Sequence, residues 1–539
     1  MSVSCSNLCS SLTFPSSEFP VSPVSCVSHA ANSTITITGG QATAGCGSTI
    51  TPEVDLCRVV LTVETSDESE TYIEVWLPEG NSEWNGRTMN TDNGGVNGCV
   101  HYVDMQYVSG LGFAAIGDNA GHNGSSFDAT WFAGSNEVIL DWVYRARHSA
   151  VVAGKEVVNQ FYDQSPDYSY YIGCSAGGAQ GLKSAQMYPE DFDGIIAGSA
   201  AADFNHLQAW SGRFVQLTGT SSSDDRFLTE DDWITVQSAI FAQCDAALDG
   251  VDDGILEDPT ICQFDASVLS NSTYGLTETQ VETVKKVFSE LYNTAGNLLF
   301  PALLYGSQVD AFRLGQLSGS VQAISEDWYK YAVLDDDSWS ALDMDQADYA
   351  RADKLDASHG NVSAYSGDLS SFSSAGGKLI MYHGMADPLV SEGNSQRYYL
   401  KVAETMGLSN TGLDDFLRLF RISGMAHCGV GGISGAGAWM FGQNGEASVA
   451  SHNIIQYLQD WVEDSIAPET IIGTKYWYDE QANGVQFERA HCRFPYRTTY
   501  RGGDSTLPGS WGCDLIEDWQ ECGPGALPRL CNVDGSFEP

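Results

Sequence analysis

The sequence is poor in positive charge and has no long hydrophobic run. It holds 25 Lys and Arg against 70 Asp and Glu, which gives 539 residues a formal net charge of -45 at pH 7. Nucleic acids and anionic membranes would repel such a chain, so neither is an expected partner. No run of about 18 or more apolar residues occurs, so we expect no transmembrane helix.

Two further features are missing: cysteine pairs with the spacing of a zinc site, and the charged and apolar segments of a signal peptide. None of the 14 cysteines forms a CxxC pair, and Met1–Cys5 lacks the charged start and apolar core of a signal peptide, so we expect such a peptide to be absent from this sequence. The many cysteines, together with N-x-S/T sequons, instead favour a secreted, extracellular protein. The sequon asparagines are Asn32, Asn123, Asn271 and Asn361.

The chain length predicts a main domain with an insertion, because 539 residues exceed one compact domain. Strands alternate with helices, which predicts an α/β fold with a mainly parallel sheet, but this alternation is lost between about 205 and 375. We expect, in chain order, a disulfide-linked N-terminal arm (1–48), a catalytic domain in two segments (49–204 and 376–513), an inserted lid (205–375) and a C-terminal extension (514–539). The lid aromatics are interpreted mainly as core and its acidic run 335–337 as a solvated face.

A serine framed by glycines organises the first catalytic segment. Gly173, Ser175 and Gly177 match G-x-S-x-G, the nucleophile elbow, in which a strand turns sharply into a helix and exposes the serine. The aromatic and β-branched run 168–172 predicts the strand, and 179–187 predicts the helix. A glycine-rich surface turn with an idle serine is the alternative.

Two later strand ends supply the acid and the base. In α/β-hydrolases the nucleophile is followed along the chain by the acid and then the histidine. Asp387 follows a strand predicted at 378–382, and His427 follows a strand predicted at 416–422. Ser175, Asp387 and His427 therefore form the expected catalytic triad. An Asp-Pro turn is the structural alternative for Asp387.

Three other histidines are alternatives for the base. His383 precedes Asp387 by four residues and is interpreted as part of the turn that orients the acid. His122 and His206 do not follow the last strands.

The oxyanion hole has two predicted backbone donors. Ala176 directly follows the serine, and its N–H is the usual first donor. The glycine-rich segment 93–99 follows an early strand, where such hydrolases place the second donor, so we assign it to Gly95. A plain turn is the alternative for this segment.

Two cysteines flank the predicted nucleophile and base. Cys174 precedes Ser175 and Cys428 follows His427, so the two cysteines meet if serine and histidine do, and we expect a disulfide between them. A thiol nucleophile at Cys174 is the rival interpretation.

An aspartate-rich loop in the lid predicts a calcium site. Residues 244–255 place aspartates between glycines, and calcium accepts six to eight oxygen ligands, including carbonyls. The spacing is not that of an EF-hand, and an acidic solvated turn is the alternative. Cys262 is close enough in sequence to bridge to Cys244.

Four motifs together resemble the tannase and feruloyl esterase family. They are the elbow 173–178 with 189–195, the loop 244–259, the segment 383–388 and the segment 424–428, within a similarity that covers about 40 to 513. The resemblance implies an α/β-hydrolase fold with a lid, a Ser-His-Asp triad flanked by bridged cysteines, and a structural Ca²⁺.

The same resemblance implies which residues hold the ion. Carboxylates of Asp249 and Asp253 and carbonyls of Val251 and Ile255 are the matching ligands, whereas Asp245 departs from the family spacing by one residue and is a less certain ligand. The remaining cysteines expected in disulfides are Cys492, Cys513, Cys522 and Cys531. No pairing is predicted for Cys5, Cys9, Cys26, Cys46, Cys57 and Cys99.

The resulting prediction is a secreted serine carboxylesterase that hydrolyses feruloyl esters of plant cell-wall polysaccharides. A tannase that cleaves gallate esters is the alternative within the family, and an inactive carbohydrate-binding wall protein is the alternative from another class. The preferred phenolic acid, the lid residues that bind its ring and the oligomeric state are not predicted.

Overall fold

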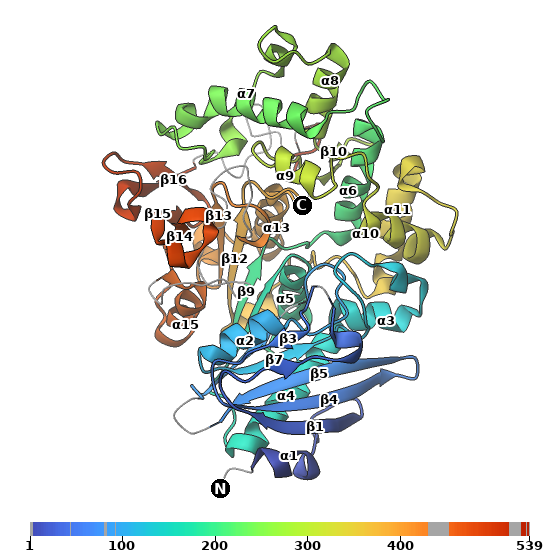
Figure 1. The fold of residues 1–539 in the computed structure, drawn as a ribbon, viewed down its shortest axis with the longest axis vertical. Helices are drawn as coiled ribbons and strands as arrows, with labels where there is room; N and C mark the ends of the chain where they lie inside the picture. The colour runs from blue at the N-terminus through green and yellow to red at the C-terminus, as the bar shows by residue number, and fades with distance from the viewer. Residues whose placement is uncertain are drawn as a thin grey trace. The chain divides into compact units, whose positions relative to one another are not determined.

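Two compact units make up the chain, which is drawn in Figure 1. The computed structural model describes residues 4–43, 45–79, 84–91, 93–429, 452–516, 530–534 and 536–537. Unit 1 contains Met1–Ala197, Lys354–Ala364 and Asp368–Leu379, and unit 2 contains Gly198–Asp353, Tyr365–Gly367 and Ile380–Pro539. In the described part of the chain, no helix is long and apolar enough to cross a membrane. The arm, lid and extension boundaries expected from the sequence stay predictions.

Unit 1 is built on a mixed sheet with the strand order β1-β4-β5-β7-β6-β8-β9. The pairs β1/β4, β4/β5 and β5/β7 are antiparallel, whereas β7/β6 and β6/β8 are parallel. The strands of the unit are β1 (Val21–His29), β2 (Ile35–Thr36), β3 (Thr49–Ile50), β4 (Leu56–Ser66), β5 (Ser69–Pro78), β6 (Arg87–Thr91), β7 (Ala114–Asp118), β8 (Tyr168–Cys174) and most of β9 (Gly194–Gly198). This architecture confirms the predicted α/β fold.

Helix α4 (Ala146–Tyr162) covers one face of this sheet. Apolar residues recur along α4 at helical spacing, and they pack on the alternate apolar residues of β4 and β5. A Cβ added at Gly154 would lie 2.5 Å from Ile116 of β7, so the glycine permits this close approach. The other helices are α1 (Cys5–Ser11), α2 (Tyr102–Gly110), α3 (Asn136–Leu140), α5 (Ala176–Met187) and α12 (Ser370–Ser374), and a π-helical turn (Asp141–Arg145) joins α3 to α4.

The N-terminal segment adds an edge strand that the sequence did not predict. Its serine-rich composition hides β1, which pairs with β4 and alternates between partly buried and exposed residues. Disulfides join the segment to β4 and to the segment 93–99, and a third joins α1 to β1. The bridges are Cys5–Cys57, Cys9–Cys26 and Cys46–Cys99.

Unit 2 combines a helical region with the last strands. Its helices are α6 (Phe204–Thr218), α7 (Glu230–Asp249), α8 (Glu278–Val287), α9 (Gln308–Arg313), α10 (Ala323–Asp327), most of α11 (Gln346–Leu355), α13 (Glu392–Met406), α14 (Asn410–Leu413) and α15 (Ile454–Asp464). Its strands are β10 (Leu291–Tyr292), β11 (Leu298–Phe300), most of β12 (Lys378–Gly384), β13 (Leu417–Ile422), β14 (Thr470–Tyr476), β15 (Val485–Cys492), β16 (Tyr496–Tyr500) and β17 (Trp511–Leu515). Cys492 is bonded to Cys513.

Large aromatic side chains form the core of the helical region, as the sequence predicted. Trp210, Trp233, Trp328 and Tyr329 are fully buried. The acidic run 335–337 is exposed and forms the expected solvated face. The many aromatic residues of this region therefore contribute mainly to core packing.

Candidate active site

Ser175 lies in the strained turn between β8 and α5. Its backbone has φ 63° and ψ -122°, outside the allowed regions of ordinary residues, and helix α5 begins with the next residue. Strand, sharp turn and helix are the geometry of a nucleophile elbow. The first N–H groups of α5, including that of Ala176, have no acceptor within the helix and point toward its N-terminal end.

The glycine-rich loop leaves the same edge of the sheet as the elbow. Strands β6 and β8 are parallel, with Thr91 opposite Ile172, so the carboxyl ends of the two strands lie side by side. Gly95 has φ 59°, and a Cβ there would lie 2.4 Å from the Ser126 carbonyl oxygen. Only glycine fits this position, which brings backbone rather than side chain to the edge.

His122 supports this loop rather than acting as a base. It is buried, and its Nε2 lies 3.0 Å from the Val96 carbonyl oxygen. Burial lowers the pKa of His122, although nearby carbonyl acceptors oppose the effect. The lowered pKa favours the neutral ring, and the ring holds the loop that contains Gly95.

Asp387 and His427 form a hydrogen-bonded pair in unit 2. His427 Nδ1 donates to Asp387 Oδ2 over 2.7 Å, and the Asp387 side chain is fully buried. The carboxylate also accepts the backbone N–H groups of Leu389 and Val390, at 2.8 and 2.9 Å. Burial alone would raise the pKa of Asp387, but the charge of His427 and the hydrogen bonds from His383 and His427 outweigh it and hold the pKa well below its usual range.

His383 orients the acid, as interpreted from the sequence. Its Nε2 lies 3.1 Å from Asp387 Oδ2 and 2.9 Å from the Val390 carbonyl oxygen, and its Nδ1 lies 2.8 Å from Ser395 Oγ. The side chain is fully buried. His383 therefore holds Asp387 from the buried side. Of the two histidines that contact Asp387, His427 is the partly exposed one, with 15% of its side chain accessible.

The predicted triad is distributed over both units. Ser175 belongs to unit 1, whereas Asp387 and His427 belong to unit 2. Cys174 and Cys428 are each disulfide-bonded, which their predicted pairing requires. Contact between Ser175 and His427, and the pairing of the two cysteines, stay predictions.

A buried arginine, Arg421, and a partly exposed one, Arg497, tie the segment after the aspartate-rich loop to the elements around Asp387 and His427. Arg421, at the end of β13, donates to Glu392 Oε1 over 2.9 Å and to Asp258 Oδ1 over 3.3 Å. Arg497 also donates to Asp258, over 2.6 Å. Burial would raise the pKa of Asp258, but the two arginines outweigh it and lower the pKa. The sequence did not predict this cluster; the signal it offers is the small number of basic residues in an acidic chain.

The aspartate-rich loop contains carboxylate oxygens that have no partner. Asp245 Oδ1 and Asp249 Oδ2 are buried and lack hydrogen-bond donors among the described residues. Their other oxygens cap the loop, accepting from Gly254 N at 2.9 Å and Val251 N at 2.8 Å. Burial raises the pKa of Asp245 to about 6. Two orphaned acceptors in one loop fit a hard cation.

Asp253 fits the cation less well than the sequence suggested. Its oxygens accept from Ile255 N at 3.1 Å and from Arg489 Nη2 at 2.6 Å, so its charge is already paired. Among the described residues, one group of three possible metal ligands has its ligand atoms within 4.8 Å of one another. It consists of Cys5, Cys57 and Glu79 rather than the loop aspartates, and its two cysteines are bonded to each other. Cys244 is bonded to Cys262, which fixes the ends of the loop.

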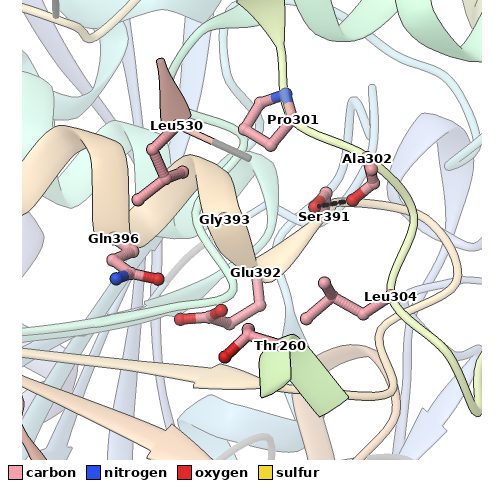
Figure 2. A pocket seen from close by; sticks show the side chains of 9 residues that line it. All are labelled: Thr260, Pro301, Ala302, Leu304, Ser391, Glu392, Gly393, Gln396 and Leu530. Atoms are coloured by element: carbon pink, nitrogen blue, oxygen red, sulfur yellow. Dashed lines mark hydrogen bonds between the residues drawn. The ribbon is translucent and has the colours of Figure 1, made fainter. Parts of the chain in front are cut away.

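Two small cavities lie near the acid in unit 2. Figure 2 shows the larger one, about 20 Å³, at the start of α13, with Glu392, Gln396 and Thr260 on one side and Pro301 and Leu530 on the other. The smaller, about 10 Å³, is lined by Met385, Ala386 and Gly424, together with Phe241, Leu256, Pro259, Tyr305 and Gly306. A cavity that holds benzene has about 150 Å³. Neither cavity admits a phenolic ring, although the larger has room for a water molecule.

The fold and the two half-sites, Ser175 in unit 1 and the Asp387–His427 pair in unit 2, define a class of enzyme. An elbow serine after a strand of an α/β sheet, with an Asp–His pair after later strands in chain order, is the arrangement of α/β-hydrolases. The family model described as "Tannase and feruloyl esterase" matches residues 57–513. The chain belongs to the tannase and feruloyl esterase family and is a carboxylic ester hydrolase.

Named relatives are fungal. A probable feruloyl esterase B-1 of Aspergillus flavus is 42% identical over 85% of this chain and 86% of its own length. A probable feruloyl esterase B-2 of Aspergillus fumigatus is 41% identical over 89% of this chain and 90% of its own. The crystal structure of feruloyl esterase B from Aspergillus oryzae matches with a TM-score of 0.85 and 38% identity, over 95% of this chain and all of that chain. Tannin acyl hydrolase from Aspergillus niger matches with a TM-score of 0.73 but 19% identity, over 95% of each chain, which shows the shared fold.

Proposed function

We propose that this chain is a feruloyl esterase whose catalytic triad is Ser175, His427 and Asp387. The observation that carries the proposal is the 2.7 Å hydrogen bond between His427 Nδ1 and the buried Asp387. A carboxylate on Nδ1 fixes the tautomer that leaves Nε2 as the proton acceptor for a serine. The strained elbow at Ser175 supports the identity of that serine.

The residues act in two steps. Ser175 Oγ attacks the ester carbonyl while His427 Nε2 takes the hydroxyl proton, and the N–H groups of Ala176 and Gly95 stabilise the oxyanion. The bond to the alcohol breaks as His427 returns the proton to the leaving oxygen. Water then attacks the acyl-serine by the same route, which releases the phenolic acid and restores Ser175.

The substrate class rests on the relatives. Proteins named feruloyl esterase B are about 40% identical to this chain, whereas the tannin acyl hydrolase is 19% identical. We therefore propose hydroxycinnamoyl esters of plant cell-wall polysaccharides as substrates rather than gallate esters. Hydrolysis of methyl ferulate, methyl caffeate and methyl gallate by the wild type and by Ser175→Ala tests this. Faster turnover of gallate would make the protein a tannase, and no turnover of any ester would favour a binding protein.

Calcium is a proposed structural partner of the aspartate-rich loop. Asp245 and Asp249 would hold the ion with their unpartnered oxygens, the carbonyls of Val251 and Ile255 would add ligands, and Asp253 would contribute a charge shared with Arg489. The ion would supply positive charge to buried carboxylates and takes no part in ester hydrolysis. Metal analysis of the purified protein tests this.

We also propose that the enzyme is secreted and carries N-linked glycans. The described disulfides fit an oxidising compartment. All four sequon asparagines are exposed: Asn32, Asn123, Asn271 and Asn361. Treatment of the secreted protein with peptide N-glycosidase, followed by mass spectrometry, identifies the occupied sites.

A further inference from the structure

One buried arginine of unit 1 contacts both segments that carry the proposed oxyanion donors. Arg147 lies in α4 and is 3% exposed. Its Nη2 donates to Asn93 Oδ1 over 2.8 Å and to Gln180 Oε1 over 2.7 Å. Asn93 lies two residues before Gly95, and Gln180 lies four residues after Ala176 on α5. A single nitrogen therefore connects the glycine-rich loop to the elbow helix.

The remaining contacts of Arg147 anchor it to the sheet. Nη1 donates to the Thr91 carbonyl oxygen at the end of β6, over 2.5 Å, and lies 3.2 Å from Asp118 Oδ2 at the end of β7. The guanidinium also lies over the Tyr171 ring of β8, 5.2 Å from its centre. Arg147 thus contacts the carboxyl ends of β6, β7 and β8.

Asn93 transmits the position of Arg147 to the loop. Its amide nitrogen donates to the Cys99 carbonyl oxygen over 2.9 Å and to the Asp118 carbonyl oxygen over 2.7 Å. These bonds join the beginning of the segment 93–99 to its end and to β7. With Arg147 on its amide oxygen, Asn93 is buried and held on three sides, so the loop cannot shift without breaking these bonds.

On the other side, Gln180 and Tyr171 hold the first turn of α5. The Tyr171 hydroxyl donates to the Gly177 carbonyl oxygen over 2.6 Å, and its ring lies under Arg147. Gln180 is buried in the same helix. Displacement of the guanidinium would therefore change the position of this turn, which begins with Ala176.

We propose that Arg147 is a positioning residue that sets the separation of the Ala176 and Gly95 N–H groups. The inference rests on the proposed serine mechanism. A planar guanidinium presents its donors in a fixed fork, whereas the lysine ammonium has no such geometry. Loss of one oxyanion donor lowers kcat about 10²- to 10³-fold, and a misplacement of about 1 Å costs about 10²-fold.

The test compares three variants of the full chain. Arg147→Lys keeps a positive charge but loses the fork, and Gln180→Leu removes one acceptor while Arg147 stays paired with Asp118. Arg145→Lys is the matched control: Arg145 lies two residues earlier and binds Asp141 and Glu137, and among the described residues it makes no hydrogen bond or ion pair with the segment 93–99 or with α5. Circular dichroism and thermal melting first establish which variants fold.

The expected result is a loss of kcat on methyl ferulate with KM within about twofold. We expect roughly 100-fold for Arg147→Lys, roughly 10-fold for Gln180→Leu and less than 2-fold for Arg145→Lys. A trifluoromethyl ketone that forms a tetrahedral adduct with serine should lose affinity in parallel, while ferulate binding stays unchanged. A purely structural role would lower the melting temperature without this split.

Two outcomes separate the inference from the function on which it rests. If Ser175→Ala retains turnover, the serine mechanism fails. If Ser175→Ala is inactive but Gln180→Leu keeps the wild-type kcat and ketone affinity, the mechanism stands and the role of Arg147 is overturned. Gln180→Leu decides the question even where Arg147→Lys does not fold.

Discussion

The two half-sites are held in place by different physical means. Around Ser175 the functional groups are backbone: a strained turn, a helix N-terminus and a glycine whose position tolerates no Cβ. Around Asp387 they are ionisable side chains, with two imidazoles on one buried carboxylate and a cluster of arginines and acids nearby. Backbone donors do not titrate, whereas a charged pair does. Changes of pH and metal should therefore act through unit 2, and changes of packing through unit 1.

The largest expected effect comes from the nucleophile. Ser175→Ala should lower kcat by about 10⁵-fold or more and leave the melting temperature nearly unchanged, because alanine at φ 63° bears the same strain as serine. Steady-state kinetics and calorimetry measure the two quantities. Residual activity near wild type would assign the nucleophile to another residue.

The acid should come second. Asp387→Asn keeps the shape of the site but removes the negative charge that stabilises protonated His427, so we expect kcat to fall about 10⁴-fold. Here stability should fall too, because the buried His383 and the partly exposed His427 both lose their ionic acceptor. Kinetics of this variant alongside His427→Ala give the comparison, and equal kcat in the wild type and Asp387→Asn would contradict the triad.

Loss of the predicted Cys174–Cys428 bridge should lower the catalytic rate more than loss of another bridge does. Replacing both cysteines by alanine releases the base from the nucleophile, and we expect kcat to fall roughly 10- to 100-fold, the scale of a 1 Å misplacement. The bridge Cys492–Cys513 offers a matched control because neither cysteine adjoins a triad residue. A peptide map of the unreduced protein that pairs Cys174 with any other cysteine would remove the basis of this prediction.

The smallest effect concerns the aspartate-rich loop. Without an ion, burial raises the folded pKa of Asp245 to about 6, above the unfolded value, so its contribution favours the fold at low pH and is lost as pH rises through about 6. We expect chelation to cost little stability near pH 4 and roughly 2 kcal/mol more at pH 7.5.

Thermal melting with chelator or with calcium at both pH values measures this difference. Asp245→Asn should flatten the pH dependence in chelator, and Asp337→Asn, in the exposed acidic run, is the control. The same chelator effect at both pH values would contradict the assignment of Asp245.

Local patterns in the sequence predicted the elements that carry the site. The strand before Ser175, the helix after it and the strands before Asp387 and His427 occur as β8, α5, β12 and β13. These segments have regular apolar spacing, so local propensity and tertiary structure agree. The edge strand β1 was missed because its serines carry little apolar signal, and its partner β4 supplies the pairing.

Contacts between distant segments were beyond prediction. Nothing near Arg147 in the sequence indicates that it binds Asn93 and Gln180, because those contacts depend on the sheet order β7-β6-β8. A contact between distant segments also makes Asp253 a weaker candidate ligand of the ion than Asp245 and Asp249. Arg489 lies more than 200 residues from Asp253 in sequence, and it donates to a carboxylate that the family resemblance had assigned to the ion.

Unit 1 also constrains the order in which the protein can be completed during synthesis. Lys183 of α5 is buried, and its ammonium donates to the carbonyl oxygens of Asn361 and Ser363, the first of which lies 178 residues further along the chain. At about 5–20 residues per second, the ribosome takes roughly 10–35 s to supply those carbonyls. Until that later segment has been made, Lys183 on the helix that presents the serine stays solvated and lacks its native partners. The emerging chain cannot complete its nucleophile half before the returning segment has been translated.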